Sequence, residues 1–169
     1  MLYELITPEN IQFLKNVSNW EEAIRQSAKP LLENKTIEPS YVDAIIKNAK
    51  ELGPYIVIGP EIAIPHARPE AGVNKVGMSV LKLEEPVDFS NDQQERPVTL
   101  LFCLAATDST SHLEALSELT QLLVNEDTFN QLKNILLIFF INTPLSSSFF
   151  LILQQYHKQK EKVYFDTKC

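Results

Sequence analysis

The stretch that decides the fold runs from Pro97 to Asn125 and reads PVTLLFCLAATDSTSHLEALSELTQLLVN. Its first ten residues are almost continuously apolar, which is typical of a strand covered on both faces. The rest begins with residues that favour a helix N-terminus and continues with leucines at helical spacing. A buried strand that leads directly into an amphipathic helix indicates a layered α/β domain.

The sequence before this stretch predicts two helices, over residues 20–34 and 41–52, because apolar residues recur there every three or four positions. Asn19 or Ser18 is expected to cap the first helix, and Pro30 is expected to bend or shorten it. Ser40 is expected to cap the second helix, and Gly53-Pro54 is expected to end it. Helices therefore come first in this part of the chain.

Short β-branched runs follow these helices. Residues 55–66 contain two such runs divided by Gly59-Pro60, and residues 75–87 alternate imperfectly between apolar and polar. With residues 97–106, they predict an α/β fold with a mixed sheet flanked by helices on both faces in a single layered domain.

Composition restricts the function classes. The chain has 169 residues, and 15 Lys and Arg against 22 Asp and Glu give a net charge of −7. No basic stripe with interleaved aromatics is present, so we expect no nucleic-acid partner. The spacing of Cys103 and Cys169 suggests neither a disulfide nor a metal site, and the N-terminus does not resemble a signal peptide. We therefore expect a cytoplasmic protein that needs no metal or cofactor.

His66 is the first candidate catalytic residue, in the stretch IAIPHARPE over residues 62–70. Pro65 and Pro69 stiffen the backbone on either side, so the imidazole is expected on a rigid turn that leaves a strand. A histidine held in this way, and largely uncharged near neutral pH, is suited to act as a nucleophile. The alternative is a turn histidine that only bonds a nearby carbonyl.

His112 is the second candidate. Ser111 and Glu114 have the spacing of a capping box, which predicts Ser111 as the N-cap and His112 as the first helical residue. Unpaired N–H groups at that helix end would bind an anion such as phosphate. The alternative is a cap with no further role. Together the two histidines favour phosphoryl chemistry.

With these residues in view, the sequence resembles the enzyme IIA component of the bacterial phosphoenolpyruvate-dependent sugar phosphotransferase system, fructose and mannitol class. The runs GPYIVIGPEIAIPHARPEAGV, VGMSVLKLEEPVDF and PVTLLFCLAATDSTSHLEALSELTQLL carry the resemblance, and PHARPE is most similar to the ascorbate-type branch. The resemblance implies a phosphotransferase component with a phosphohistidine intermediate and a domain over residues 1–134. His66 would accept a phosphoryl group from HPr and pass it to a cysteine or histidine of enzyme IIB, with IIC as the membrane permease, and His112 would contact that group.

One active-site residue of the mannitol branch does not carry over. Its arginine on the helix before the active-site strand has lysine or asparagine in its place within AIIKNAKELG. Arg68 is expected to bind phosphate instead, with Ser111, because a guanidinium matches phosphate oxygens well. The alternative for Arg68 is a solvated residue paired with Glu70. Glu70, Asp108 and Leu113 are expected either to receive a basic partner protein or to be ordinary surface.

A regulatory role remains as an alternative function, in which the phosphorylation state of the histidine controls a protein partner. A binding module that only keeps the fold is a third interpretation, and the presence of both histidines disfavours it. Residues 135–169 do not fit the family pattern, because an apolar stretch there is broken by Pro144 and three serines. This tail is interpreted as a product of frame-shift, a membrane-seeking segment or a helix packed on the domain.

Overall fold

The computed structural model describes residues 5–90, 95–124 and 130. The sequence EDTFNQLKN over residues 126–134 predicts a further short helix, and this stretch and the tail over 135–169 lie outside the described residues, apart from residue 130. The described part folds around a five-stranded mixed sheet in the order β1-β4-β5-β3-β2. β1 is parallel to β4 and β3 is parallel to β5, whereas the β4–β5 and β2–β3 pairs are antiparallel. The predicted mixed α/β fold is confirmed.

The elements follow in a simple order along the chain. A 3-10 turn, η1 (Pro8–Asn10), leads into β1 (Ile11–Leu14), which precedes α2 (Trp20–Glu33) and α3 (Pro39–Leu52). The chain then returns to the sheet. The remaining elements are β2 (Val57–Gly59), β3 (Glu61–Ala63), η2 (Pro69–Ala71), β4 (Gly77–Asp88), β5 (Pro97–Ala105) and α4 (Ser109–Val124). Sequence reasoning missed β1, a four-residue strand whose residues are all only half-buried.

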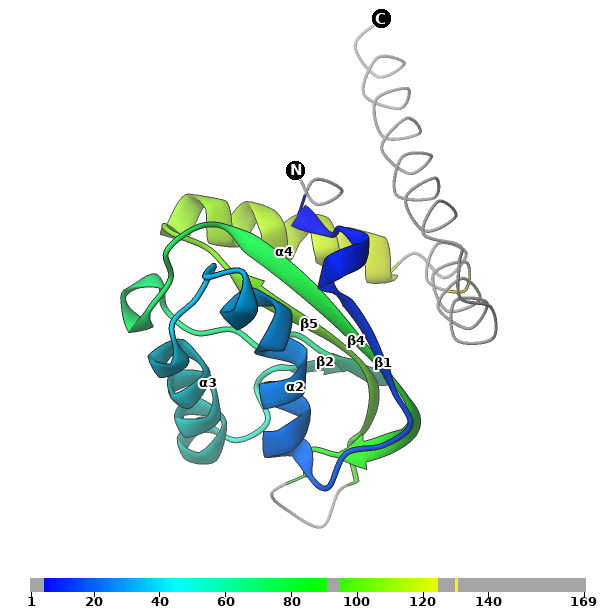
Figure 1. The fold of residues 1–169 in the computed structure, drawn as a ribbon. Helices are drawn as coiled ribbons and strands as arrows, with labels where there is room; N and C mark the ends of the chain where they lie inside the picture. Colours follow the sequence, from blue (N-terminus) through cyan, green and yellow to red (C-terminus); the bar gives the residue numbers. More distant parts are fainter. Residues whose placement is uncertain (1–4, 91–94, 125–129, 131–169) are drawn as a thin grey trace, which may run out of the picture.

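The sheet is covered on both faces, with α2 and α3 on one side and α4 on the other (Figure 1). Alternation along β5 produces this arrangement: Leu101 and Cys103 pack in the cluster beneath α2 and α3, and Leu100 and Phe102 pack with Leu119 of α4. Since both faces of the strand are buried, its sequence is apolar at successive positions. The interpretation of PVTLLFCLAA is confirmed.

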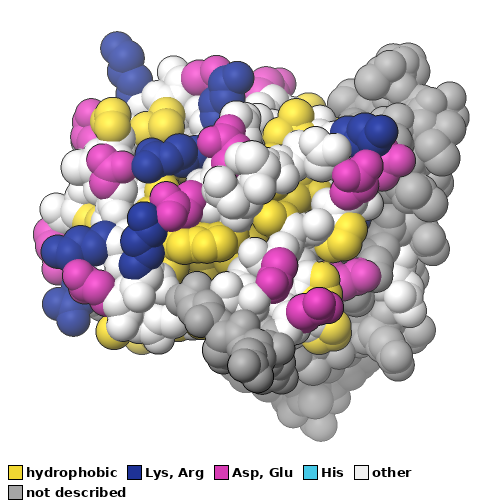
Figure 2. Space-filling view, turned by 90° about the horizontal axis from the view of Figure 1, so that it is seen from below, with side chains coloured by type: hydrophobic (Ala, Val, Ile, Leu, Met, Phe, Trp, Pro, Cys, Tyr) yellow, Lys and Arg dark blue, Asp and Glu magenta, His cyan; other side chains and the backbone are white. Residues whose placement is uncertain are grey.

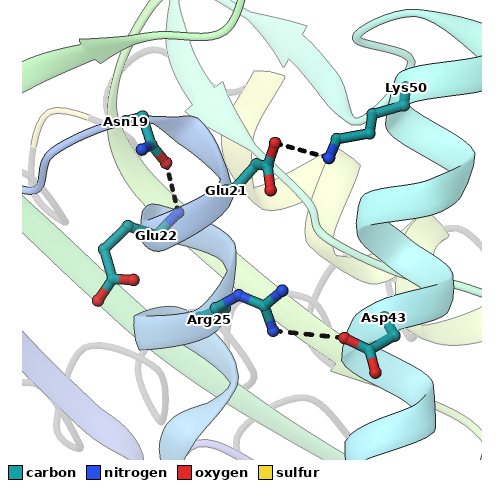
Figure 3. Close-up of polar contacts among 6 residues, drawn as sticks. All are labelled: Asn19, Glu21, Glu22, Arg25, Asp43 and Lys50. Carbon is teal, nitrogen blue, oxygen red and sulfur yellow. Dashed lines mark hydrogen bonds and ion pairs between the residues drawn. The ribbon is translucent and has the colours of Figure 1, made fainter.

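Helix α2 begins where the sequence predicted. The Asn19 side chain accepts a hydrogen bond of 2.9 Å from Glu22 N, as an N-cap does (Figure 3). The helix continues past Pro30 to Glu33. Pro30 has no N–H to donate to the carbonyl of Gln26 four residues earlier, and the Gln12 side chain donates to that oxygen instead, at 2.6 Å. A side chain from β1 therefore compensates for the proline.

The predicted cap of the second helix is wrong. α3 begins at Pro39 with Glu38 in the N-cap position and no side-chain cap, whereas the Ser40 hydroxyl donates to Ala71 O at 2.8 Å. The predicted end is confirmed, because α3 stops at Leu52 and Gly53 adopts a φ of 82°. The serine therefore joins α3 to η2, close to the candidate site, instead of capping its own helix.

Two exposed ion pairs link α2 with α3. Glu21 contacts Lys50 at 2.8 Å, and Arg25 contacts Asp43 at 3.3 Å (Figure 3). On the molecular face seen in Figure 2, basic and acidic side chains are interspersed, and no histidine is visible among the described residues. This mixture is unlike the continuous basic surface that binds a nucleic-acid backbone.

Candidate active site

The turn that carries His66 is fixed by backbone hydrogen bonds. Ile64 N donates to Ile56 O at 2.8 Å, and Leu104 N donates to Pro65 O at 3.0 Å. His66 therefore lies three residues after β3 and is tied through its preceding residue to the end of β5. It lies near the end of strand material between Pro65 and Pro69, as expected, but in the irregular segment over residues 64–68 that joins β3 to η2 and not in a regular turn. The rigidity of this segment stays a prediction.

The His66 ring is held by its own backbone neighbourhood. Its Nδ1 lies 2.7 Å from the carbonyl oxygen of Ile64, and because a carbonyl can only accept, Nδ1 carries the proton. In the neutral ring the lone pair is then on Nε2. Burial lowers the pKa of His66 below its ordinary value, although the bond to Ile64 opposes that effect. A neutral imidazole with a defined tautomer results.

His112 lies beside this ring. The centroids of the two imidazoles are 5.1 Å apart, with the ring planes inclined at 52°. The pKa of His112 is lowered, first by burial and then by the nearby His66. The structure thus brings together the two histidines that sequence analysis singled out, and both favour the uncharged form.

The predicted start of α4 is wrong. The helix begins at Ser109, so His112 is its fourth residue, and the capping side chain belongs to Asp108. The Asp108 carboxylate accepts from Thr110 N and Ser111 N, both at 2.9 Å, and from the Ser111 hydroxyl at 2.7 Å. These bonds lower the pKa of Asp108, the bond from Ser111 N having the largest effect. His112 N bonds Asp108 O at 3.1 Å.

This cap has a consequence for the expected phosphate site. The N–H groups of Thr110, Ser111 and His112 already bond Asp108, so they are not the unpaired donors that the sequence suggested. The Ser111 hydroxyl donates to the same carboxylate. Phosphate binding by Ser111 stays a prediction, and it requires this hydroxyl to leave Asp108.

A cavity of about 550 Å³ adjoins the two histidines. Its walls come from the end of α3, the segment before β2, the turn after β3 and the first turn of α4. The residues that line it are Asn48, Leu52, Tyr55, His66, Ala67, Arg68, Pro69, Glu70, His112 and Leu113. Leu52 and Leu113 are 72% and 66% exposed, which is unusual for leucine and places apolar surface on the rim.

Arg68 is the basic residue among those that line the cavity. The described part of the chain shows no ion pair between Arg68 and Glu70, the pairing that its alternative interpretation assumed. On α3, Asn48 lines the cavity, whereas Lys47 pairs with Glu51 at 3.9 Å and Lys50 pairs with Glu21. Sequence analysis placed a lysine or an asparagine where the mannitol branch has its arginine. Of these residues, Asn48 is the one that lines the cavity.

Sequence reasoning missed two tyrosines that support the site. The Tyr55 hydroxyl donates to His66 O at 2.7 Å, and Ala67 N donates to the Tyr41 hydroxyl at 3.1 Å. Tyr41 is fully buried within an otherwise aliphatic helix face. The available signal was that a buried tyrosine hydroxyl requires a polar partner inside the core.

The described residues hold no group of three or more His, Cys, Asp and Glu side chains arranged to bind a metal ion. No helix among them is both long enough and apolar enough to cross a membrane.

Comparison with known proteins shows the family of this chain. The profile of the phosphoenolpyruvate-dependent sugar phosphotransferase system, EIIA 2, matches residues 4–136. The chain belongs to this family and is a component of a phosphotransferase system. The expected resemblance is confirmed.

Relatives of this chain include named components of phosphotransferase systems. The ascorbate-specific PTS system EIIA component of Escherichia coli K12 is 34% identical over 126 residues, covering 74% of this chain and 81% of the relative. The crystal structure of a PTS IIA protein, PtxA, from Streptococcus mutans has a TM-score of 0.72 and 31% identity, covering 86% of this chain and 87% of that one.

A third relative was solved with a partner. In the complex of enzyme IIAMTL with phosphorylated enzyme IIBMTL from Escherichia coli, the matched chain has a TM-score of 0.61 and 31% identity. The match covers 72% of this chain and 83% of that one. A protein of this family is thus found with an enzyme IIB as its partner.

Proposed function

We propose that the protein is a phosphocarrier which accepts a phosphoryl group from phospho-HPr on His66 and transfers it to enzyme IIB during sugar uptake. The observation that supports this most directly is the neutral His66 ring, whose Nδ1–H is bonded to Ile64 O beside a cavity shared with His112. The proposed nucleophile is Nε2, because Nδ1 has no lone pair available in this tautomer.

The two transfers balance without a metal or cofactor. In the first, Nε2 of His66 forms a bond to phosphorus as the bond from phosphorus to HPr breaks, and the electron pair stays on HPr. In the second, a side chain of IIB takes the phosphoryl group, and the electron pair returns to Nε2. Such transfers depend mainly on alignment and on stabilising the charge of three equatorial oxygens.

Two residues are proposed to stabilise that charge. His112 supplies a ring N–H from beside His66, and Arg68 supplies a guanidinium from the cavity wall. The exposed Leu52 and Leu113 on the rim provide apolar surface for the partner protein. By likeness to the ascorbate-specific relative, the acceptor is the IIB of an ascorbate system.

The test is labelling by radioactive phospho-HPr. The wild-type protein should become labelled, with the acid lability and alkali stability of a phosphorus–nitrogen bond, and His66→Ala should not. Undiminished labelling of folded His66→Ala would refute the assignment. A wild-type protein that is labelled but transfers nothing to any IIB would instead favour the regulatory alternative.

A further inference from the structure

A single peptide bond beside His66 is held at both ends by tyrosine hydroxyls. Its carbonyl, on His66, accepts from the Tyr55 hydroxyl at 2.7 Å, and its N–H, on Ala67, donates to the Tyr41 hydroxyl at 3.1 Å. Tyr41 comes from α3, and Tyr55 comes from the segment between α3 and β2. Two hydrogen bonds from different parts of the chain therefore fix the plane of this peptide.

We propose that Tyr41 and Tyr55 are positioning residues, which hold the His66–Ala67 peptide and thereby aim the His66 ring for phosphoryl transfer. This rests on the proposed function, in which His66 accepts the phosphoryl group. The residue before His66 is Pro65, whose φ is fixed, and the peptide after His66 is held by the two tyrosines. Little freedom remains in the backbone that carries the nucleophile.

Tyr41 also joins the His66 turn to the strand that leads to His112. Its hydroxyl lies 2.7 Å from Leu104 O and 3.1 Å from Ala67 O, and since it has one proton, the shorter contact receives it. Leu104 N donates in turn to Pro65 O. Tyr41 therefore holds the segment of His66 at a fixed distance from β5, which leads to His112, and it also holds the His66–Ala67 peptide.

Tyr55 contributes a second contact through its ring. The Tyr55 and His66 ring centroids are 5.3 Å apart, and the planes meet at 82°, an edge-to-face arrangement. This packing restricts rotation of the imidazole. Burial raises the pKa of both tyrosines above the ordinary value, so each hydroxyl keeps its proton at physiological pH.

The experiment compares Tyr41→Phe, Tyr55→Phe and the double variant with wild type. Phenylalanine keeps each ring and removes only the hydroxyl. In steady-state transfer from phospho-HPr to IIB, each variant should lower kcat by roughly 10- to 100-fold, the loss expected when a reacting group is misplaced by a fraction of an ångström to an ångström. The KM for phospho-HPr should change little, because neither hydroxyl is proposed to bind the partner.

A second readout does not depend on activity. In nitrogen-15 NMR spectra of the wild-type protein, His66 should be a single tautomer protonated on Nδ1. In the variants it should become a mixture of tautomers, and its pKa should fall further below the ordinary value, because the bond to Ile64 O, which opposes the effect of burial, is weakened. Tyr55 is only half-buried, so Tyr55→Phe decides the outcome if Tyr41→Phe does not fold.

Ser79→Ala is the matched control. The buried Ser79 hydroxyl donates to Ser27 O at 2.5 Å, joining β4 to α2, and neither residue lines the cavity. This variant should lose stability through one buried hydrogen bond and keep the wild-type kcat and His66 spectrum. Wild-type kcat and tautomer in a folded double tyrosine variant would overturn the positioning role. An unlabelled His66 in the wild-type protein would overturn the proposed function instead.

Discussion

The imidazole rings of His66 and His112 lie with their centroids 5.1 Å apart, one on the turn after β3 and the other in the first turn of α4. Each ring is partly buried, and a proton on one disfavours a proton on the other. Burial lowers the pKa of both rings, and the nearby His66 lowers that of His112 further, so both rings stay neutral to a lower pH than an ordinary histidine.

The first prediction concerns pH. Because the neutral ring is the nucleophile and its pKa is lowered, labelling of His66 by phospho-HPr should persist on acidification and fall with a midpoint below about 6.5. Histidine NMR titration should give the same value. A midpoint above 6.5 would contradict the proposed environment of the ring. In His66→Gln, the pKa of His112 should rise, since one cause of its depression is removed.

The same shifts predict a change in stability. The folded pKa of each histidine lies below the unfolded value, so the unfolded chain takes up protons first as pH falls. The stability they provide is complete above about pH 6.5 and is lost as pH falls from there through the folded pKa. Urea unfolding at several pH values should show this loss, and it should be smaller in the folded double variant His66→Gln and His112→Gln.

Replacement of His112 should separate the two transfers. His112→Ala should still be labelled at His66 but pass the phosphoryl group to IIB more slowly by about 10²–10³, the effect of removing one preorganised donor. His112→Gln keeps a donor and should lose less. Single-turnover kinetics measure both steps, with circular dichroism as the control for folding. Wild-type rates in His112→Ala would show that the residue only belongs to the first turn of the helix.

Arg68 should act on phosphate and not through Glu70. Arg68→Gln should slow labelling of His66 by about tenfold, which corresponds to the loss of one charge-assisted hydrogen bond of about 1.5 kcal/mol. Arg68→Lys should recover the charge but not the forked geometry, so its labelling rate should lie between those of the wild type and Arg68→Gln. Glu70→Gln is the control and should leave the chemical step unchanged. An equal effect of Arg68→Gln and Glu70→Gln would favour an ordinary ion pair.

The contact between Gln12 and Gln26 O can be tested by a double-mutant cycle. Gln12→Ala should lower the free energy of unfolding by about 1 kcal/mol. The reason is that the Gln26 carbonyl, to which Pro30 cannot donate, then loses its hydrogen-bond donor. In a Pro30→Ala background, residue 30 regains an N–H for this carbonyl, and Gln12→Ala should cost less. Urea denaturation measures each corner. Equal costs in both backgrounds would show that Gln12 does not replace the missing donor.

The domain limit is a further prediction. A chain ending at Asn134 should fold, remain at least as soluble as the full chain and still be labelled on His66, if residues 135–169 are foreign to the domain. Circular dichroism and the labelling assay test both properties. Unfolding of the shortened chain would show that the last segment completes the core.

Local sequence determined much of this protein. Apolar residues at successive positions of β5 specified a strand buried on both faces, Asn19 specified the start of α2, and Pro65 fixed the backbone φ directly before His66. These features depend on residues close together in the chain, whose steric and hydrogen-bonding preferences act over a few positions. The family resemblance added the pairing of His66 with His112.

Only the tertiary structure decided the remaining features. Asp108 and Ser111 are both acceptable N-caps, and the carboxylate of Asp108 is the one that accepts the N–H groups of α4. Strand β1 is too short to identify alone and is defined by its pairing with β4. The hydrogen bonds from Tyr41 and Tyr55 to the His66–Ala67 peptide join segments that meet only when the sheet and α3 have packed. No local preference encodes such contacts, because the partners become neighbours only through folding of the whole domain.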